Sequence, residues 1–415
     1  MLPTLRPVDP PLGNYIRPGR NDHLVLLQLA AENRLGVTGL VVDATLIARQ
    51  DDLIKEAQTQ GTETVLDPRT ADLASETGLS LSGVADLPWA PGTTHSIDDL
   101  AGPGGLLLAE ELAEFVVKEN LTAILAPTHV LASADDPWLR VDADLTKQLR
   151  RGLDSRARNH TPIYYPLIVR STVFSEPRQR ITLMNTLRSL PVDAIWLRIH
   201  PFGTTSSGPL ALRRYIEACQ AFHDLGIPLV AERTGTVGVA LLALGAVGGI
   251  ESGVTLGERF SLDRYSRPRN GKGFLPPPRV YLAQLGAFLT RKQAQAFFDH
   301  RGMRAAFGCQ DPGCCRRGID DMVQNPRRHF VLKRAAEVAK LSRTPAELRS
   351  TIYMDEFLRP ASDAIVRASK AEPSLGAVQK RLDSWRGTLG ALLAEDRVNS
   401  YSLVPDGRRV RAGDE

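Results

Sequence analysis

Three of the four cysteines of this chain, Cys309, Cys314 and Cys315, fall within seven residues, and His329 follows them on an expected helix. Three thiolates and one imidazole are the donor set of a closed tetrahedral zinc site. The segment between them is short, polar and rich in turn residues, so a bound metal would supply stability that a core cannot. The sequence therefore predicts a structural Zn²⁺ held by these four residues. A small buried thiol cluster and a disulfide are the alternatives.

Polar side chains also end a series of short apolar runs. In a parallel α/β barrel the carboxyl ends of the strands meet at one mouth, where active sites lie. Two carboxylates there could divide the work, one as nucleophile and one as general acid or base, and arginines would suit a phosphate or a polar purine edge. A carboxylate after a strand is also a common helix N-cap, which is the alternative for each acid. The residues concerned are Asp43, Asp67, His129, Arg198, His200, Glu232, Arg233 and Glu251.

The runs themselves predict the fold. Seven strand-like runs alternate with longer amphipathic stretches, and an eighth strand is expected near 280–283. Runs that are apolar on both faces favour a buried parallel sheet. We therefore predict an α/β fold, a (β/α)8 TIM-like barrel with a zinc-binding insertion and a C-terminal helical extension. An open doubly wound sheet is disfavoured, because no glycine-rich dinucleotide fingerprint follows the first run. The runs are 39–43, 64–67, 123–127, 163–169, 194–199, 228–232 and 247–251.

The expected domain organisation has four parts: an N-terminal arm at 1–37, a catalytic barrel at 38–305, a zinc-binding subdomain at 306–342 and a helical extension at 343–415. Within the arm, residues 15–20 are expected to approach the barrel mouth. The chain is 43% hydrophobic and 24% charged, as in ordinary globular proteins. It has no apolar run long enough for a membrane span and no signal-peptide pattern, so we expect no membrane contact and a cytoplasmic location.

A basic loop is expected at 257–279, interrupted by glycine and proline. Cationic side chains interleaved with Tyr265 and Phe274 suit a nucleic-acid backbone and a stacked base. The net charge of +4 permits such a partner without requiring it. A solvated surface loop is the alternative. The basic residues of this loop include Arg259, Arg264, Arg267, Arg269 and Lys272.

A barrel followed by a late cysteine and histidine cluster resembles the tRNA-guanine transglycosylase superfamily, which includes relatives that act on DNA for 7-deazaguanine modification. The order of parts is similar over residues 38–340. Asp67 occupies the place of the family's early aspartate, although Pro68-Arg69-Thr70-Ala71 replaces its Ser-Gly-Gly-Phe. Two further stretches look like family segments, the base-recognition Gly-Gly-Leu-Ala-Val-Gly-Glu and the Pro-Thr-Arg and Asn-Gly stretch after the nucleophile. They are Ser252-Gly253-Val254-Thr255-Leu256-Gly257-Glu258 and Arg267-Pro268-Arg269-Asn270-Gly271.

The sequence departs from the family pattern at two places. Its cysteines follow Cys-x4-Cys-Cys rather than Cys-x-Cys-x2-Cys, and His329 comes sooner. Where the family's nucleophilic aspartate is expected, Ile250-Glu251 supplies a glutamate, with Asp263 as the aspartate close behind. The family includes accessory subunits that have lost the nucleophile, so a non-catalytic role stays open.

The resemblance implies base exchange at a guanine N-glycosidic bond of tRNA or DNA, through a carboxylate-linked covalent intermediate that a 7-deazapurine base captures. No redox cofactor or ATP is needed, and the zinc would be structural. We expect Asp67 to act as acid and base, with Glu251 or Asp43 as nucleophile or partner carboxylate. The expected substrate-binding residues are Arg198, His200, Glu232, Arg233, Gly253, Glu258, Arg267 and Arg269.

Two other functions remain as alternatives at this point. One is a non-catalytic accessory homologue that binds nucleic acid. The other is a barrel lyase or hydrolase that acts on a small phosphorylated or carboxylated metabolite. A homodimer is compatible with each of them.

Overall fold

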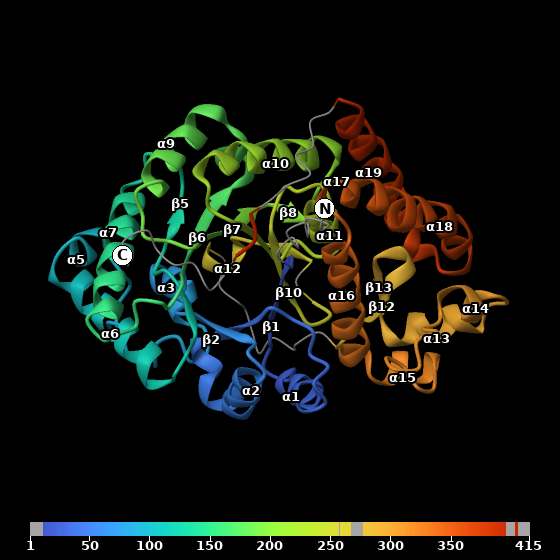
Figure 1. Ribbon diagram of the computed structural model, residues 1–415, viewed down its shortest axis with the longest axis horizontal. Helices are drawn as coiled ribbons and strands as arrows, with labels where there is room; N and C mark the ends of the chain where they lie inside the picture. Colours follow the sequence, from blue (N-terminus) through green and yellow to red (C-terminus); the bar gives the residue numbers. More distant parts are fainter. Residues whose placement is uncertain (1–10, 257, 267–276, 396–402, 406–415) are drawn as a thin grey trace, which may run out of the picture.

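Eight parallel strands form a closed barrel at the centre of the molecule (Figure 1). The computed structural model describes residues 11–256, 258–266, 277–395 and 403–405. The ring closes because β1 pairs with β2 on one side and with β10 on the other, which confirms the predicted (β/α)8 barrel. Around the ring the strands are β1 (Gly13–Arg17), β2 (Gly39–Asp43), β3 (Glu63–Asp67), β4 (Ala123–Leu125), β6 (Ile163–Arg170), β7 (Ala194–His200), β9 (Leu229–Glu232) and β10 (Gly249–Gly253).

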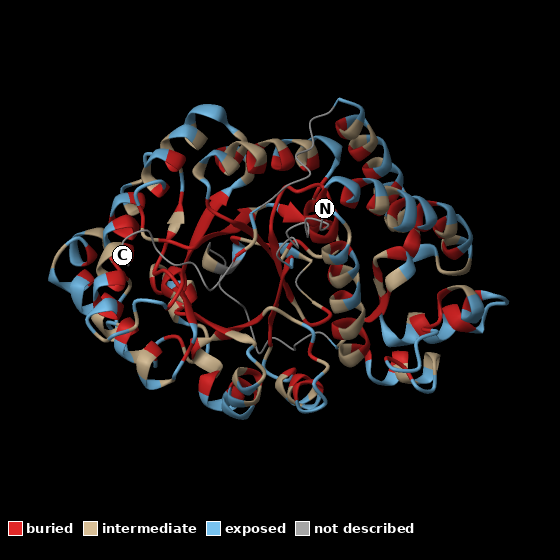
Figure 2. Cartoon of the chain, viewed as in Figure 1, coloured by how far each residue is buried: buried red, intermediate tan, exposed pale blue. Residues whose placement is uncertain are grey.

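Helices cover the outside of the barrel between successive strands (Figure 1). α7 begins at Pro137 because Asp136 accepts a hydrogen bond from the Trp138 amide and so caps the first turn. The strands are buried on both faces, as Figure 2 shows, since helices pack outside and side chains fill the inside. The wall helices are α1 (His23–Ala31), α2 (Ile47–Thr59), α6 (Pro103–Lys118), α7 (Pro137–Asp154), α9 (Pro177–Leu187), α10 (Pro209–Phe222) and α11 (Val237–Ala243).

Short elements occupy the connections between these strands and helices. Most of them follow the carboxyl end of a strand, at the mouth where barrel enzymes build their sites. They are η1 (Ala44–Leu46), α3 (Thr70–Leu73), α4 (Glu76–Leu79), α5 (Ile97–Leu100), β5 (Val130–Leu131), α8 (Ser171–Ser175), β8 (Phe202–Gly203) and η2 (His223–Leu225).

The first barrel strand lies in the segment expected to be an N-terminal arm. Residues 13–17 form β1, and α1 is the first wall helix, so the barrel does not begin at residue 38. The strand expected near 280 is instead β12 (Val280–Leu282), which pairs antiparallel with β13 (Ala287–Leu289) outside the barrel. Gly286 adopts a left-handed φ of 54° and reverses the chain there, which turns the apolar run into a hairpin.

A long insertion separates β10 from the helix that completes the barrel wall. That helix is α16 (Pro326–Arg343), which packs against α1, α11 and β1. The cysteine cluster therefore lies in the last barrel connection, and the barrel does not end at residue 305 as expected. Besides β12 and β13, the insertion contains β11 (Arg259–Phe260), α12 (Asp263–Ser266), η3 (Ala283–Leu285), α13 (Arg291–Asp299), α14 (Met303–Phe307) and α15 (Ile319–Gln324).

The predicted C-terminal helical extension is present on one side of the barrel (Figure 1). Its last two helices pack against each other, and the final one also packs on α10. No helix in the described part of the chain is both long and apolar enough to cross a bilayer. The extension consists of α17 (Ala346–Tyr353), the π-helix η4 (Met354–Leu358), α18 (Arg359–Ala371), η5 (Pro373–Leu375) and α19 (Gly376–Ala394).

An aromatic layer fills the barrel below its mouth. The Trp196 ring centroid lies 4.8 Å from that of Tyr15 and 5.4 Å from that of Tyr164. Gly39 makes room for this layer, because a Cβ atom there would lie 2.9 Å from the Tyr15 ring. The barrel interior is therefore a packed core, and any chemistry must occur at the carboxyl ends of the strands.

Glu63 is a partly buried acid beneath this layer, and Tyr164 donates a hydrogen bond to its carboxylate. Desolvation raises the pKa of Glu63 to about 7; Asp193 adds to the rise, and hydrogen bonds from Tyr164 and Tyr15 oppose it. The folded pKa therefore lies above the unfolded value of about 4.3. The resulting stabilisation is complete below the unfolded pKa and is lost as pH rises through the folded pKa.

We expect Glu63→Gln to remove part of the pH dependence of stability. Between about pH 5 and pH 8 the wild type should lose roughly 2 kcal/mol more unfolding free energy than the variant. Urea unfolding over this range measures the difference. The exposed Glu114→Gln on α6 is the matched control and should follow the wild type. Parallel curves for wild type and Glu63→Gln would contradict the raised pKa.

Candidate active site and metal centre

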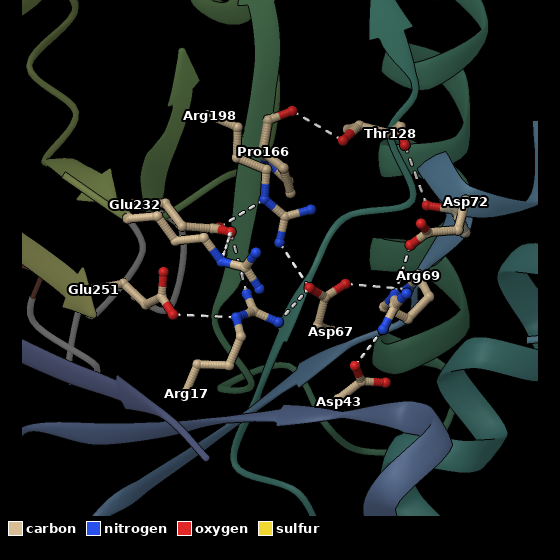
Figure 3. A network of polar contacts seen from close by, with 12 residues as sticks. Arg17, Asp43, Asp67, Arg69, Asp72, Thr128, Pro166, Arg198, Glu232 and Glu251 are labelled. Atoms are coloured by element: carbon tan, nitrogen blue, oxygen red, sulfur yellow. Dashed lines mark hydrogen bonds and ion pairs between the residues drawn. The ribbon is translucent and has the colours of Figure 1, made fainter. Parts of the chain in front are cut away.

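Five charged side chains from five strand ends form one buried ion network at the barrel mouth (Figure 3). Arg17 Nη1 lies 2.6 Å from Asp67 Oδ2, and Arg17 Nε lies 3.1 Å from Glu251 Oε1. From the opposite side, Arg198 Nη2 lies 2.7 Å from Asp67 Oδ2 and its Nε lies 2.6 Å from Glu232 Oε2. None of the five side chains is more than 8% exposed. The barrel thus brings together Asp67, Arg198, Glu232 and Glu251, as the strand ends predicted.

Asp67 is the most strongly held carboxylate of this network. Its Oδ2 accepts from both guanidinium groups, and its Oδ1 accepts from the Arg69 backbone amide at 3.0 Å. Burial raises the pKa of Asp67, but the charges of Arg198, Arg17 and Arg69 outweigh it and hold that pKa well below its usual range. Asp67 therefore stays ionised, which disfavours the acid and base role expected from the sequence.

Glu251 has the opposite electrostatic character. It is fully buried, its Oε1 accepts from Arg17, and its Oε2 has no hydrogen-bond partner among the described residues. Burial raises the pKa of Glu251, and Glu232 adds to the rise, while Arg17 opposes it. For Glu232, burial also raises the pKa, but Arg198 and Arg17 outweigh burial and lower it. Glu251 is thus the carboxyl of this set best suited to exchange a proton.

Arg69 links a second pair of acids to the network (Figure 3). Its guanidinium pairs with Asp43 and lies 2.5 Å from Asp72. Asp43 also accepts from the Thr45 amide and caps η1, so the N-cap alternative holds for this acid. Arg69 has a left-handed φ of 61°, which a non-glycine residue adopts rarely. Asp43 therefore contacts the network only indirectly: it pairs with Arg69, whose backbone amide donates to Asp67.

The other predicted binding residues are spread over the rim. Arg233 Nε lies 3.8 Å from Glu232 Oε1, next to the network. His200 accepts a hydrogen bond from the Leu262 amide through Nδ1, and Gly253 contributes backbone at the end of β10. Glu258 lies outside the network, with its carboxylate 3.8 Å from Arg279. Arg267 and Arg269 lie outside the described residues.

The segment that follows β10 covers the mouth. Its strand β11 pairs antiparallel with β8, which joins Phe260 to Phe202. Phe260 and Leu262 are buried in a small apolar cluster with Ala71 and Ile168. This cover keeps water away from the ions beneath it, and a low dielectric strengthens their interactions.

Arg17 is the one residue of the network that the sequence does not predict. Residues 15–20 are expected near the mouth, but the short run before Arg17 does not predict the strand β1. The available signal was an arginine that directly ends the short run Tyr15-Ile16. His129 was considered but lies outside the network: its Nδ1 pairs with Asp142 at 2.6 Å, its Nε2 meets His95 at 3.2 Å, and it is fully buried.

The four predicted metal ligands converge on one point. Their donor atoms all lie within 4.8 Å of one another, and all four residues are buried. Cys314 Sγ and Cys315 Sγ are 3.8 Å apart and lie 3.4 and 3.3 Å from His329 Nδ1. A tetrahedral site with M–S near 2.3 Å and M–N near 2.0 Å requires edges of about 3.5–3.8 Å. All four cysteines lie in the described part of the chain, and none forms a disulfide.

The surroundings of the cluster also fit a metal site. His329 Nε2 lies 3.0 Å from the Tyr281 carbonyl oxygen, so the ring donates there and leaves Nδ1 free to bind metal. Asp311 accepts from the amides of Gly313 and Cys314 and fixes the loop between the ligands. The cluster therefore lies where α16 contacts the β12–β13 hairpin, and a metal ion bound there would tie the two together.

No protein-family model matches the sequence, and no curated protein matches it. Among solved structures, the chain is similar to a GH18 chitinase from Pseudoalteromonas aurantia, at 13% identity and TM-score 0.37 over 58% of this chain and 93% of that one. It is also similar to 3-dehydroquinate dehydratase from Enterococcus faecalis, at 10% identity and TM-score 0.36 over 59% of this chain and 90% of that one. A third similar structure is the carboxyl transferase domain of Rhizobium etli pyruvate carboxylase, at 9% identity and TM-score 0.38 over 96% of this chain and 63% of that one. Sequence identities and TM-scores this low support no conclusion about the activity of this chain.

We expect Arg17→Met to destabilise the protein by about 3–5 kcal/mol at neutral pH, because three buried carboxylates lose a counter-ion. The loss should shrink as pH falls, since the carboxyl groups can then take up protons. Urea unfolding at two pH values measures both effects. The exposed Arg20→Met is the control and should change stability by less than about 0.5 kcal/mol. Equal effects of the two substitutions would contradict the central role of Arg17.

Removal of a cluster ligand should remove the metal. We expect about one metal ion per wild-type chain by elemental analysis, and little or none in Cys314→Ala or His329→Ala. Thermal unfolding should show a loss of several kcal/mol for both variants. Cys219→Ala, a buried cysteine on α10 outside the cluster, should keep the metal. Metal-free wild-type protein purified without chelators would disprove the site.

Proposed function

We propose that this chain exchanges a guanine base in tRNA or DNA for a 7-deazapurine base. The observation that carries the proposal is the mouth network, in which one protonatable carboxyl, Glu251, lies among carboxylates that Arg17 and Arg198 keep charged. Cleavage of an N-glycosidic bond needs such a pair, a charged group facing C1′ and an acid at the leaving base.

The pKa directions of Glu232 and Glu251 support different catalytic roles for these two carboxyl groups. The charged Glu232 attacks C1′ as the glycosidic bond breaks, and its electron pair passes to the purine. Glu251 gives the leaving guanine its proton through the unbonded Oε2. The incoming base returns a proton to Glu251, attacks C1′ and releases the Glu232 carboxylate. Asp67 stays ionised throughout and holds both arginines in place. These roles replace the expectation that Asp67 shuttles the proton.

Access to this site requires a base that leaves its stack. The mouth lies beneath a cover, so a nucleotide must be turned out of the polymer to enter it. Arg170 at the end of β6 and Arg259 in the cover are exposed near the mouth and would meet the phosphates. Contacts of this kind make binding weaken steeply with salt.

We also infer that the cysteine cluster holds Zn²⁺, because three thiolates and one imidazole suit zinc best. With four protein ligands no coordination position remains for water, so the ion would act structurally. The same elemental analysis that counts the metal identifies it.

The test is incorporation of labelled guanine into a guanine-containing tRNA or DNA. Wild-type protein should incorporate label, and Glu251→Gln should do so at least about 100-fold more slowly, as expected for loss of a general acid. Glu114→Gln, exposed on α6, should retain wild-type activity. Salt-sensitive binding without incorporation would indicate an accessory protein. Absence of binding to either polymer would leave a barrel enzyme for small molecules and disprove the proposal.

A further inference from the structure

A cavity of about 300 Å³ lies between the barrel wall and the C-terminal extension. Its walls come from the start of α11, from η3, from α14 and from the π-helix with α18 and α19. None of the five residues of the mouth network lines it. Its volume is at the lower end of the range for small-molecule sites. The cavity is therefore a separate place where a ligand could bind.

The walls of this cavity are mainly aromatic and aliphatic. Phe307 comes from α14, Phe357 from the π-helix and Trp385 from α19. Trp385 is only 1% exposed, whereas Phe357 is partly exposed. The exposed residues Glu356, Pro360 and Arg367 also line the cavity, so it opens to solvent. Such a chamber suits an apolar body that enters from one side.

Several buried polar atoms at this cavity lack hydrogen bonds. Among the described residues, Trp385 Nε1 and Glu337 Oε2 have no hydrogen-bond partner, and both residues line the cavity. Arg334 and Arg381 are not lining residues but are neighbours of Glu337 and Trp385. Arg334 Nε and Nη1 and Arg381 Nε also lack a hydrogen bond, although Arg334 Nε makes a 3.5 Å ion pair with Glu337. The Arg381 guanidinium lies 5.3 Å from the Trp385 ring centroid. Buried polar groups in native proteins are almost always satisfied.

The missing partners are mostly acceptors. Apart from Arg334 Nε and Glu337 Oε2, which form an ion pair with each other, the atoms without a partner are donors: Trp385 Nε1, Arg334 Nη1 and Arg381 Nε. Arg381 beside the indole and Arg367 in the cavity lining add positive charge. A π-helix, which is rare and frequent at functional sites, forms one wall. Together these features favour an anionic head group attached to an apolar body.

We propose that this cavity binds a small amphipathic organic acid. Its apolar body packs between Phe307, Phe357 and Trp385, and an oxygen of its acid group accepts the Trp385 indole N–H. The proposal does not depend on the chemistry of the barrel mouth. Thr236 lines the cavity four residues after Glu232 and donates a hydrogen bond to the Gly286 carbonyl oxygen, so an occupant contacts a segment that leads to the mouth.

The probe for this site is 8-anilinonaphthalene-1-sulfonate, an aromatic compound with one anionic acceptor group. Fluorescence titration should show saturable binding to one site per chain. Ala364→Phe places a ring inside the cavity and should weaken binding at least tenfold. Val366→Phe adds the same ring to the exposed face of the same helix and should bind like the wild type. Thermal unfolding confirms that both variants are folded.

Trp385→Phe keeps an aromatic ring but removes the N–H, and should weaken binding several-fold. The chain has four tryptophans, so ¹⁵N-indole spectra show four signals, and the one absent from Trp385→Phe belongs to Trp385. This signal should move on addition of the probe. Wild-type affinity in folded Ala364→Phe, or a Trp385 signal that does not move at saturation, would overturn the proposal.

Discussion

Two guanidinium groups allow three carboxylates to lie inside the barrel mouth, and the arrangement of the site depends on this pairing. An isolated charge in such a place would cost far more than the protein's stability, so each acid needs a cation at hydrogen-bond distance. Arg17 and Arg198 supply two positive charges to Asp67, Glu232 and Glu251. Burial and Glu232 raise the pKa of Glu251, whereas Arg198 and Arg17 lower that of Glu232, so Glu251 takes up a proton more readily than Glu232.

The same pairing fixes the shape of the mouth. Asp67 on β3 is held from β1 by Arg17 and from β7 by Arg198, so one carboxylate joins strands that are not neighbours in the ring. Networks of this kind contribute more to a unique geometry than to net stability. The cover formed by β11 and α12 then excludes water from ions whose positions are already set. The cysteine cluster lies in the same connection, next to α16, and a metal ion bound there would anchor the two together.

Local sequence patterns predicted those features that depend only on residues close together in the chain, such as strand ends, ligand spacing and helix caps. The ends of apolar runs predicted that Asp67, Arg198, Glu232 and Glu251 converge, and the spacing of Cys309, Cys314, Cys315 and His329 predicted a cluster that could hold a metal ion. The N-cap alternative holds for Asp43 but not for Asp67, because the N-cap of α3 is Arg69.

Features that depend on distant pairing could not be predicted in this way. β1 is five residues long, and its Gly-Asn-Tyr-Ile-Arg sequence becomes a strand only through β2 and β10. The run at 280–282 looks equally strand-like, but its partner is a hairpin strand. The division of proton chemistry between Asp67 and Glu251 depends on which arginines reach each carboxylate, and that information lies in the tertiary structure.

The seam between β1 and β10 has a consequence for synthesis of the protein. β1 emerges from the ribosome first among the strands of the ring, and its neighbour β10 emerges last. Until then the growing sheet has two open edges, which are templates for association with other chains. Ring closure is thus a late event during translation, because β1 has no β10 to pair with until residue 253 is exposed.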